Sequence, residues 1–216
     1  MSLIENTVEC DVAVLDAPGD EHGLTVRDPV TGTIFIGVLR NDRPMRQRSN
    51  LAHELGHVIF EDWDTGDCLP SSDPREIRAN AFARHLLIPI EGLKEFLGER
   101  DQVTLEDLSD VTQYFLVSPS ITLIVMRDAG YISAETVSKW RQHTSRGLAT
   151  RFGWSDQYES LQESSNRSCA PQTLLARAIE GYEEGLVSAQ TIASLRQVPL
   201  DQVVKELEEA EIKPRS

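Results

Sequence analysis

The sequence predicts an α+β fold that is mainly helical: a small antiparallel sheet of about three strands packed on a helical domain, with a C-terminal helical bundle or helix-turn-helix-like part. Two observations lead to this prediction. Short β-rich runs bounded by Pro, Gly and Asp lie within residues 10–40, namely Asp11–Leu15, Leu24–Val26 and Thr33–Leu39. From residue 50 onwards, apolar residues recur at helical spacing, and residues that favour helix ends stand between the runs.

Two helices are expected directly after the strands. The first covers about Asn50 to Phe60, with Ser49 or Asn50 capping its first turn. The second covers about Pro74 to Leu87, because Asp73 is a good N-cap and proline suits the first helical position. The segment between them is acidic and rich in turn residues, so we expect a solvated surface loop that contains Glu61, Asp62, Asp64 and Asp67.

The remaining chain is predicted to be helical in two blocks. Leu105–Tyr114 and Pro119–Asp128 resemble a helix-turn-helix in outline, and Gln172–Gly185, Ala189–Gln197 and Leu200–Ala210 form a three-helix pattern. The serine-rich stretch between the blocks is interpreted as a linker. The predicted division is therefore a core domain at 1–100, a helix-turn-helix-like part at 101–145, a polar linker at 146–170 and a C-terminal three-helix segment at 171–216.

The composition indicates a soluble globular protein with an acidic surface. The 35 acidic and 21 basic side chains give a net charge of −14. Because such a surface repels phosphate backbones, we expect no direct nucleic-acid binding and ascribe the acidity to solubility. The three cysteines are widely spaced and odd in number, which favours a reducing compartment. Neither a signal peptide nor an apolar stretch long enough for a membrane span is present in the sequence, so we expect a cytoplasmic protein without membrane association.

The run His53-Glu54-Leu55-Gly56-His57 carries the strongest chemical signal. Four residues of α-helix correspond to about 40° of rotation and one turn of rise, so both imidazoles project from one face and can bind zinc. Glu54 is offset by roughly 100° from His53, where a general base can take a proton from water. Chance alone supplies such a motif in roughly one shuffled sequence per hundred. The alternative is therefore a helix with two incidental histidines.

A third ligand is available on the next predicted helix. Glu76 would complete two histidines with one carboxylate, which leaves the open fourth position that hydrolytic zinc requires. Asn80 lies one turn further along the same side of that helix. It is a candidate for orienting Glu76 or a metal-bound histidine, and an ordinary surface asparagine is the alternative.

Four segments in this order carry a family resemblance. They are Arg46-Gln-Arg48, Leu51-Ala-His-Glu-Leu-Gly-His57, Glu76-Ile-Arg-Ala-Asn-Ala-Phe-Ala83 and Leu86-Leu-Ile-Pro89. Over roughly residues 20–145 the chain resembles the ImmA/IrrE family of metallopeptidases. The resemblance implies a zincin-like helical domain with residues 1–100 as the zinc metallopeptidase core. It also implies that His53, His57 and Glu76 bind Zn²⁺ and that Glu54 is the catalytic base.

The resemblance further implies a zinc-dependent metalloendopeptidase that cleaves a helix-turn-helix transcriptional repressor in stress, phage or mobile-element regulation. We expect that repressor to be a separate polypeptide, and Arg46 and Arg48 are candidates for substrate contact. An alternative function is a non-hydrolytic regulatory protein that binds and sequesters a transcription factor through the same zinc-bearing fold. The intact Glu54 argues against it, because a purely structural site has no use for a base. A DNA-binding regulator is a third alternative, which the acidity disfavours.

Overall fold

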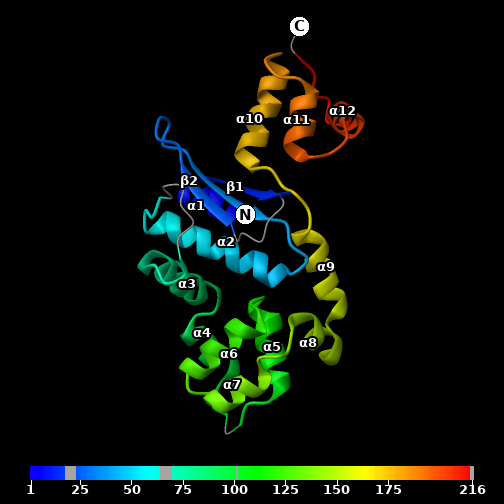
Figure 1. Ribbon diagram of the computed structural model, residues 1–216. Helices are drawn as coiled ribbons and strands as arrows, with labels where there is room; N and C mark the ends of the chain where they lie inside the picture. Colours follow the sequence, from blue (N-terminus) through cyan, green and yellow to red (C-terminus); the bar gives the residue numbers. More distant parts are fainter. Residues whose placement is uncertain (18–22, 64–69, 101, 215–216) are drawn as a thin grey trace. The chain divides into compact units, whose positions relative to one another are not determined.

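The computed structural model describes residues 1–17, 23–63, 70–100 and 102–214, and it confirms a mainly helical α+β fold (Figure 1). By its internal contacts the chain divides into two compact units. One unit combines Met1–Arg40 with Arg167–Ser216, and the other is the continuous stretch Asn41–Asn166. These divisions differ from the predicted boundaries at residues 100, 145 and 170, because the first and last parts of the chain fold together.

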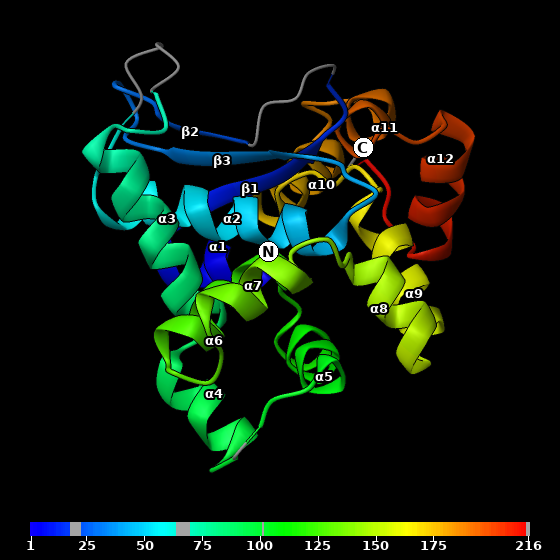
Figure 2. The ribbon, with the colours of Figure 1, turned by 60° about the horizontal axis from the view of Figure 1, so that its bottom comes forward.

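A three-stranded mixed sheet lies in the first unit. Its strands are β1 (Cys10–Leu15), β2 (Gly23–Arg27) and β3 (Ile34–Leu39), and β3 lies between the other two (Figure 2). β2 pairs antiparallel with β3, whereas β1 pairs parallel with β3. The three predicted strands are thus present, but the prediction of an entirely antiparallel sheet is wrong for β1.

The order of the strands explains the parallel pair. β2 and β3 form a hairpin closed by Asp28, whose N–H donates to the Thr33 carbonyl at 2.8 Å and whose carbonyl accepts from Gly32 at 2.9 Å. The consecutive strands β1 and β2 run in opposite directions, so a strand inserted between them is antiparallel to one and parallel to the other. Alternation of side chains along each strand contains no information on which strand is central.

Helices from both ends of the chain complete this unit. α1 (Ser2–Val8), which the sequence analysis missed, carries the buried Glu5, whose Oε1 accepts from the N–H groups of Val12 at 3.3 Å and Gln172 at 3.1 Å. The predicted three-helix pattern is confirmed by α10 (Gln172–Glu183), α11 (Ala189–Arg196) and α12 (Leu200–Glu209). Their shared core contains Ala178, Ile192, Ala193, Val203 and Leu207.

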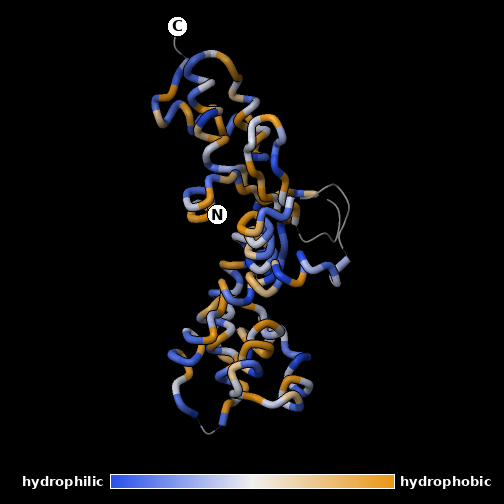
Figure 3. Tube along the Cα trace, turned by 90° about the vertical axis from the view of Figure 1, so that its left-hand side faces the viewer, coloured by the Kyte–Doolittle hydropathy of each residue, from blue (hydrophilic) through white to orange (hydrophobic). Residues whose placement is uncertain are grey.

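The second unit is built from helices around one hydrophobic core. They are α2 (Pro44–Ile59), α3 (Pro74–Leu87), α4 (Ile90–Leu97), α5 (Leu105–Phe115), α6 (Pro119–Asp128), α7 (Ala134–Trp140), α8 (Ser145–Phe152) and α9 (Ser155–Ser165). Hydrophobic and hydrophilic stretches alternate along these helices, as amphipathic helices with one buried face require (Figure 3). Leu108, Leu123, Met126 and Leu148 are almost completely buried at the centre of this core.

α2 begins six residues earlier than predicted. Pro44 occupies the first helical position, where its fixed φ suits a helix and its missing N–H costs nothing. Met45 is buried and anchors this first turn, whereas the surrounding arginines gave the segment no apolar periodicity in the sequence. The cap predicted at Ser49 or Asn50 is therefore wrong, and both residues lie inside the helix. α3 begins and ends at the predicted residues.

The stretch predicted as a polar linker, residues 146–170, is mostly helical. α8 and α9 cover much of it, and Leu148, Trp154 and Tyr158 bury their side chains in the core. The indole Nε1–H of Trp154 donates to the Ser109 hydroxyl at 2.9 Å. Several serines that suggested a linker lie at helix ends, where hydroxyl residues are favoured. A composition-based linker prediction is therefore wrong here.

The predicted pair at 105–128 is confirmed as α5 and α6. Thr104 and Asp107 form a capping box at the start of α5, and Ser118 caps α6. The two helices are bent by 110° relative to each other. No single helix in the described ranges is long and apolar enough to cross a membrane; only the bent pair α5 and α6 reaches that length and composition together.

Candidate metal centre

α2 and α3 lie in close contact at Gly56. A Cβ atom at this position would lie 3.1 Å from the Ala79 Cα and 3.2 Å from the Phe82 Cδ1. These distances are shorter than ordinary van der Waals contacts. Because His53, Glu54 and His57 surround Gly56 in the sequence, this close approach brings the histidines near the first turn of α3.

The first turn of α3 is fixed by its N-cap. The Asp73 carboxylate accepts from the Arg75 backbone N–H at 2.8 Å and from the Arg75 guanidinium at 3.1 Å. Both hydrogen bonds hold the pKa of the Asp73 carboxyl below its ordinary value, and the one from the Arg75 side chain has the larger effect. Glu76 follows in this first turn, where the helix dipole favours a carboxylate.

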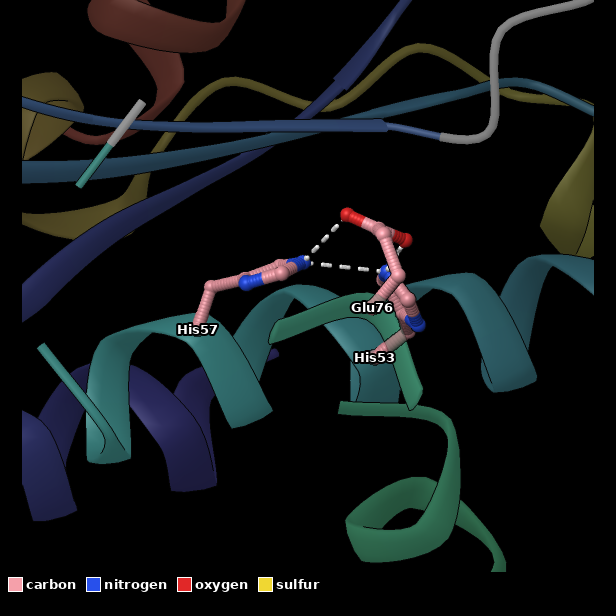
Figure 4. A group of neighbouring side chains, drawn as sticks. All are labelled: His53, His57 and Glu76. Atoms are coloured by element: carbon pink, nitrogen blue, oxygen red, sulfur yellow. Dashed lines mark hydrogen bonds and ion pairs between the residues drawn. The ribbon is translucent and has the colours of Figure 1, made fainter. Parts of the chain in front are cut away.

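The side chains of His53, His57 and Glu76 point toward one another (Figure 4). His53 Nε2 lies 3.1 Å from Glu76 Oε2, and His57 Nε2 lies 3.3 Å from Glu76 Oε1. The two Nε2 atoms are 3.1 Å apart. The side chains are 14%, 10% and 21% exposed, respectively, so the group is shielded from bulk water on most sides.

This geometry fits a tetrahedral metal ion. Ligand atoms about 2.0–2.1 Å from a tetrahedral ion are about 3.3 Å from each other, close to the separations found here. When Nδ1 carries the ring proton, the Nε2 atom of each histidine presents a lone pair next to the Glu76 carboxylate. These electron-rich atoms repel one another, and a bound cation removes that repulsion. His53, His57 and Glu76 can therefore hold a metal ion with three donors.

Asn80 lies beside the histidine that opens the motif. Its Oδ1 is 3.2 Å from Nδ1 of His53. An amide oxygen accepts only, so it favours the proton on Nδ1 and leaves Nε2 for a metal. The sequence analysis left open whether Asn80 orients a neighbouring side chain or is an ordinary surface residue. This contact corresponds to the orienting of His53.

Asp62 was not predicted at the site. Its side chain is only 9% exposed, and Oδ2 lies 3.8 Å from Nδ1 of His57. The expectation that Asp62 belongs to a solvated loop is thus wrong, whereas Asp64 and Asp67 lie outside the described residues. In the sequence, only the spacing of five residues between His57 and Asp62 pointed to a contact. That spacing brings the two side chains together only if the chain reverses its direction after α2.

A sequence model of the IrrE N-terminal-like domain, a peptidase family, matches residues 9–126, which is more than half of the chain. The chain belongs to this family. Searches of curated proteins and of solved structures found no significant match. Membership of the IrrE N-terminal-like family agrees with the resemblance found in the motifs, and the matched range contains the complete three-ligand group.

The other candidate residues of this IrrE-like domain occupy different positions on α2. Glu54 is buried, at 5% exposure. Arg46 precedes His53 by seven residues, which places it about 20° from the same helix face, two turns away. Arg48 lies about 140° around the axis from His53, so its position does not favour contact with a substrate at the metal centre. The roles of these three residues stay predictions.

Proposed function

We propose that the chain is a zinc-dependent metalloendopeptidase that cleaves a helix-turn-helix transcriptional repressor. The observation that carries this proposal is the convergence of His53, His57 and Glu76, with a buried glutamate inside the same helical turn as the histidines. Two imidazoles and one carboxylate are the donor set of many hydrolytic zinc sites. Family membership adds the expectation of peptide substrates.

The residues would divide the work as follows. His53, His57 and Glu76 would hold the ion, and bound zinc would supply Lewis acidity that activates water near neutral pH and polarises a carbonyl. Glu54 would accept a proton from the attacking water and donate it to the departing amine. Asn80 would keep the His53 ring oriented through Nδ1. A proton shuttle of this kind contributes about 10²–10⁴-fold to a rate.

A repressor is the proposed substrate class because the family resemblance implies it, and the charge of this chain is compatible with such a substrate. DNA-binding proteins carry basic surfaces, and a chain with a net charge of −14 attracts them over long range. The same charge supports a role without direct nucleic-acid binding. A role in stress, phage or mobile-element regulation belongs to the same proposal and rests on the family resemblance alone.

We propose a cytoplasmic location for this activity. Cys10 and Cys169 are free thiols, as a reducing compartment favours. Burial, the largest effect, together with the nearby Glu5 and Asp11 carboxylates raises the pKa of the Cys10 thiol to about 11, so this thiol is unreactive at neutral pH.

The substitution Glu54→Gln tests the mechanism. The zinc-loaded protein is incubated with a peptide library and, separately, with purified helix-turn-helix repressors from the same genome, and the products are identified by mass spectrometry. We expect wild-type protein to cleave and Glu54→Gln to be at least about 100-fold slower while binding zinc normally. Glu95→Gln, an exposed glutamate on α4, is the matched control and should cleave at the wild-type rate.

Two outcomes would change the proposal. Cleavage by Glu54→Gln at the wild-type rate contradicts the assigned base. Tight repressor binding without cleavage by either protein favours the alternative of a non-hydrolytic regulator that sequesters a transcription factor.

A further inference from the structure

We propose that Asp62 is a positioning residue of the metal centre, and that its carboxylate, held by Arg78, orients the imidazole of His57 toward the metal. The inference rests on the proposed function because it takes the metal centre as given. Asp62 is not one of the three proposed ligands, and it would act on one ring atom, Nδ1 of His57.

The backbone after α2 brings Asp62 to this position. The Glu61 N–H donates to the Val58 carbonyl at 3.1 Å, and the Asp62 N–H donates to the His57 carbonyl at 2.9 Å. These two bonds form a Schellman motif, in which Glu61 has a left-handed φ of 56°. Glycine is the usual residue there, because a side chain is strained at this φ. The turn folds the chain back, so that Asp62 lies beside His57.

The Asp62 carboxylate is buried and incompletely paired. Its Oδ2 has no hydrogen-bond partner among the residues described, and its separation of 3.8 Å from His57 Nδ1 is too long for a hydrogen bond. A buried carboxylate oxygen without a donor is unfavourable and requires an explanation. The Nδ1–H group of His57 would be that donor, because a small movement of the ring closes the gap once its Nε2 binds a metal.

The opposite side of the carboxylate is anchored. Arg78 Nη2 lies 2.6 Å from Asp62 Oδ1, and the Arg78 guanidinium carbon lies 4.6 Å from the centre of the Phe60 ring. Phe60 in turn contacts Phe82 edge to face, with ring centres 5.8 Å apart. Arginine thus fixes one oxygen of Asp62 and leaves the other directed at His57.

The two histidines therefore have different supports. His53 faces the neutral amide oxygen of Asn80, whereas His57 faces a carboxylate. An anionic acceptor makes an imidazole a stronger electron donor to a metal than a neutral one does. Loss of Asp62 should therefore weaken metal binding itself, independently of any catalytic step.

Zinc affinity of the purified full-length chain tests this inference. Metal-free protein is titrated with Zn²⁺ in competition with a chelating dye, and with Co²⁺ by its visible absorption. We expect Asp62→Ala to bind zinc about 10–100-fold more weakly than wild type. Asp62→Asn has one acceptor oxygen where Asp62 uses two, so it cannot accept from both Arg78 and His57 Nδ1, and it should bind zinc about tenfold more weakly than wild type. Asp128→Ala is the matched control, since Asp128 pairs with Arg127 at the end of α6, and it should bind like wild type.

The outcomes separate this inference from the proposed function. Wild-type zinc binding by a folded Asp62→Ala overturns the inference and leaves the proposed peptidase intact. If Asp62→Ala does not fold, wild-type affinity in Asp62→Asn overturns it instead. If the wild-type chain itself binds no zinc, both the proposed function and the inference are wrong.

Discussion

At the scale of single residues, the metal centre depends on which ring nitrogen of each histidine faces inward. An imidazole offers two nitrogens, and the contact at Nδ1 decides which one is left to bind a metal. Asn80 makes that contact for His53, and we assign it to Asp62 for His57. The ligands alone are therefore only part of the site.

The substitution Asn80→Ala tests this view for His53. Without the amide oxygen the ring loses its fixed orientation, so zinc affinity should fall about tenfold or more. Competition titration with a chelating dye measures the change. His85→Ala is the control, because His85 is exposed and lies about 180° around α3 from Glu76. An Asn80→Ala protein with unchanged zinc affinity would show that the contact is incidental.

The sequence predicted some of these residues better than others. His53, Glu54 and His57 follow from spacing on one helix, and Glu76 follows from the need for a third ligand. Asp62 could not be found in this way, because its direction depends on a left-handed residue at Glu61, where the sequence has no glycine to indicate it. Acidic neighbours made the same segment resemble a solvated loop.

At the scale of elements, the separation of α2 and α3 determines whether Glu76 reaches the histidines. Gly56→Ala should push the helices apart, because the new Cβ would lie 3.1 Å from the Ala79 backbone. We expect a loss of about 1–3 kcal/mol in the free energy of unfolding together with weaker zinc binding. Urea unfolding and zinc titration measure both effects.

A second helical glycine provides the control for Gly56→Ala. A Cβ at Gly92 on α4 would lie 3.7 Å from the Phe115 ring, which is an ordinary contact. Gly92→Ala should therefore leave stability unchanged or raise it by up to about 1 kcal/mol, because alanine favours helix. A Gly56→Ala protein as stable as Gly92→Ala would contradict the close-contact account.

The start of α3 has a predictable pH dependence. The pKa of Asp73 is lower in the folded than in the unfolded state. The cap therefore stabilises α3 at pH values above the ordinary carboxyl pKa of about 3.9. That contribution is lost as the pH falls through the lowered pKa. Asp73→Ala should therefore lower the unfolding temperature at pH 7 and have less effect near pH 3. An equal effect at both pH values, measured by circular dichroism, would exclude this role for the cap.

Element boundaries were predictable where local chemistry marks them. Asp73 with Pro74, and Ser118 with Pro119, identify helix starts that the structure confirms. The early start of α2 and the helices α8 and α9 were missed, because arginines or serines there hide the apolar positions. Burial of residues such as Leu148 is decided by tertiary packing, which periodicity in an eight-residue helix shows poorly.

At the scale of the whole molecule, the fold class was predictable but the division of the chain was not. The first unit joins Met1–Arg40 to Arg167–Ser216, and a boundary search along the sequence does not detect such a long-range association. The contacts that hold it include Glu5 with Gln172, and the pairing of Val14 with Cys169. The group of His53, His57 and Glu76, which could hold a metal ion, lies within the other unit, and it could be predicted because the three residues are close in sequence.

The central claim is that His53, His57 and Glu76 hold one zinc ion. The most direct test is the zinc content of the full-length protein after equilibration with buffered micromolar zinc, measured by mass spectrometry of the metal. We predict one zinc ion per chain for wild type, and strongly reduced occupancy for Glu76→Ala and His57→Ala. A wild-type chain without zinc, or a Glu76→Ala protein that binds zinc as tightly as wild type, would contradict the account.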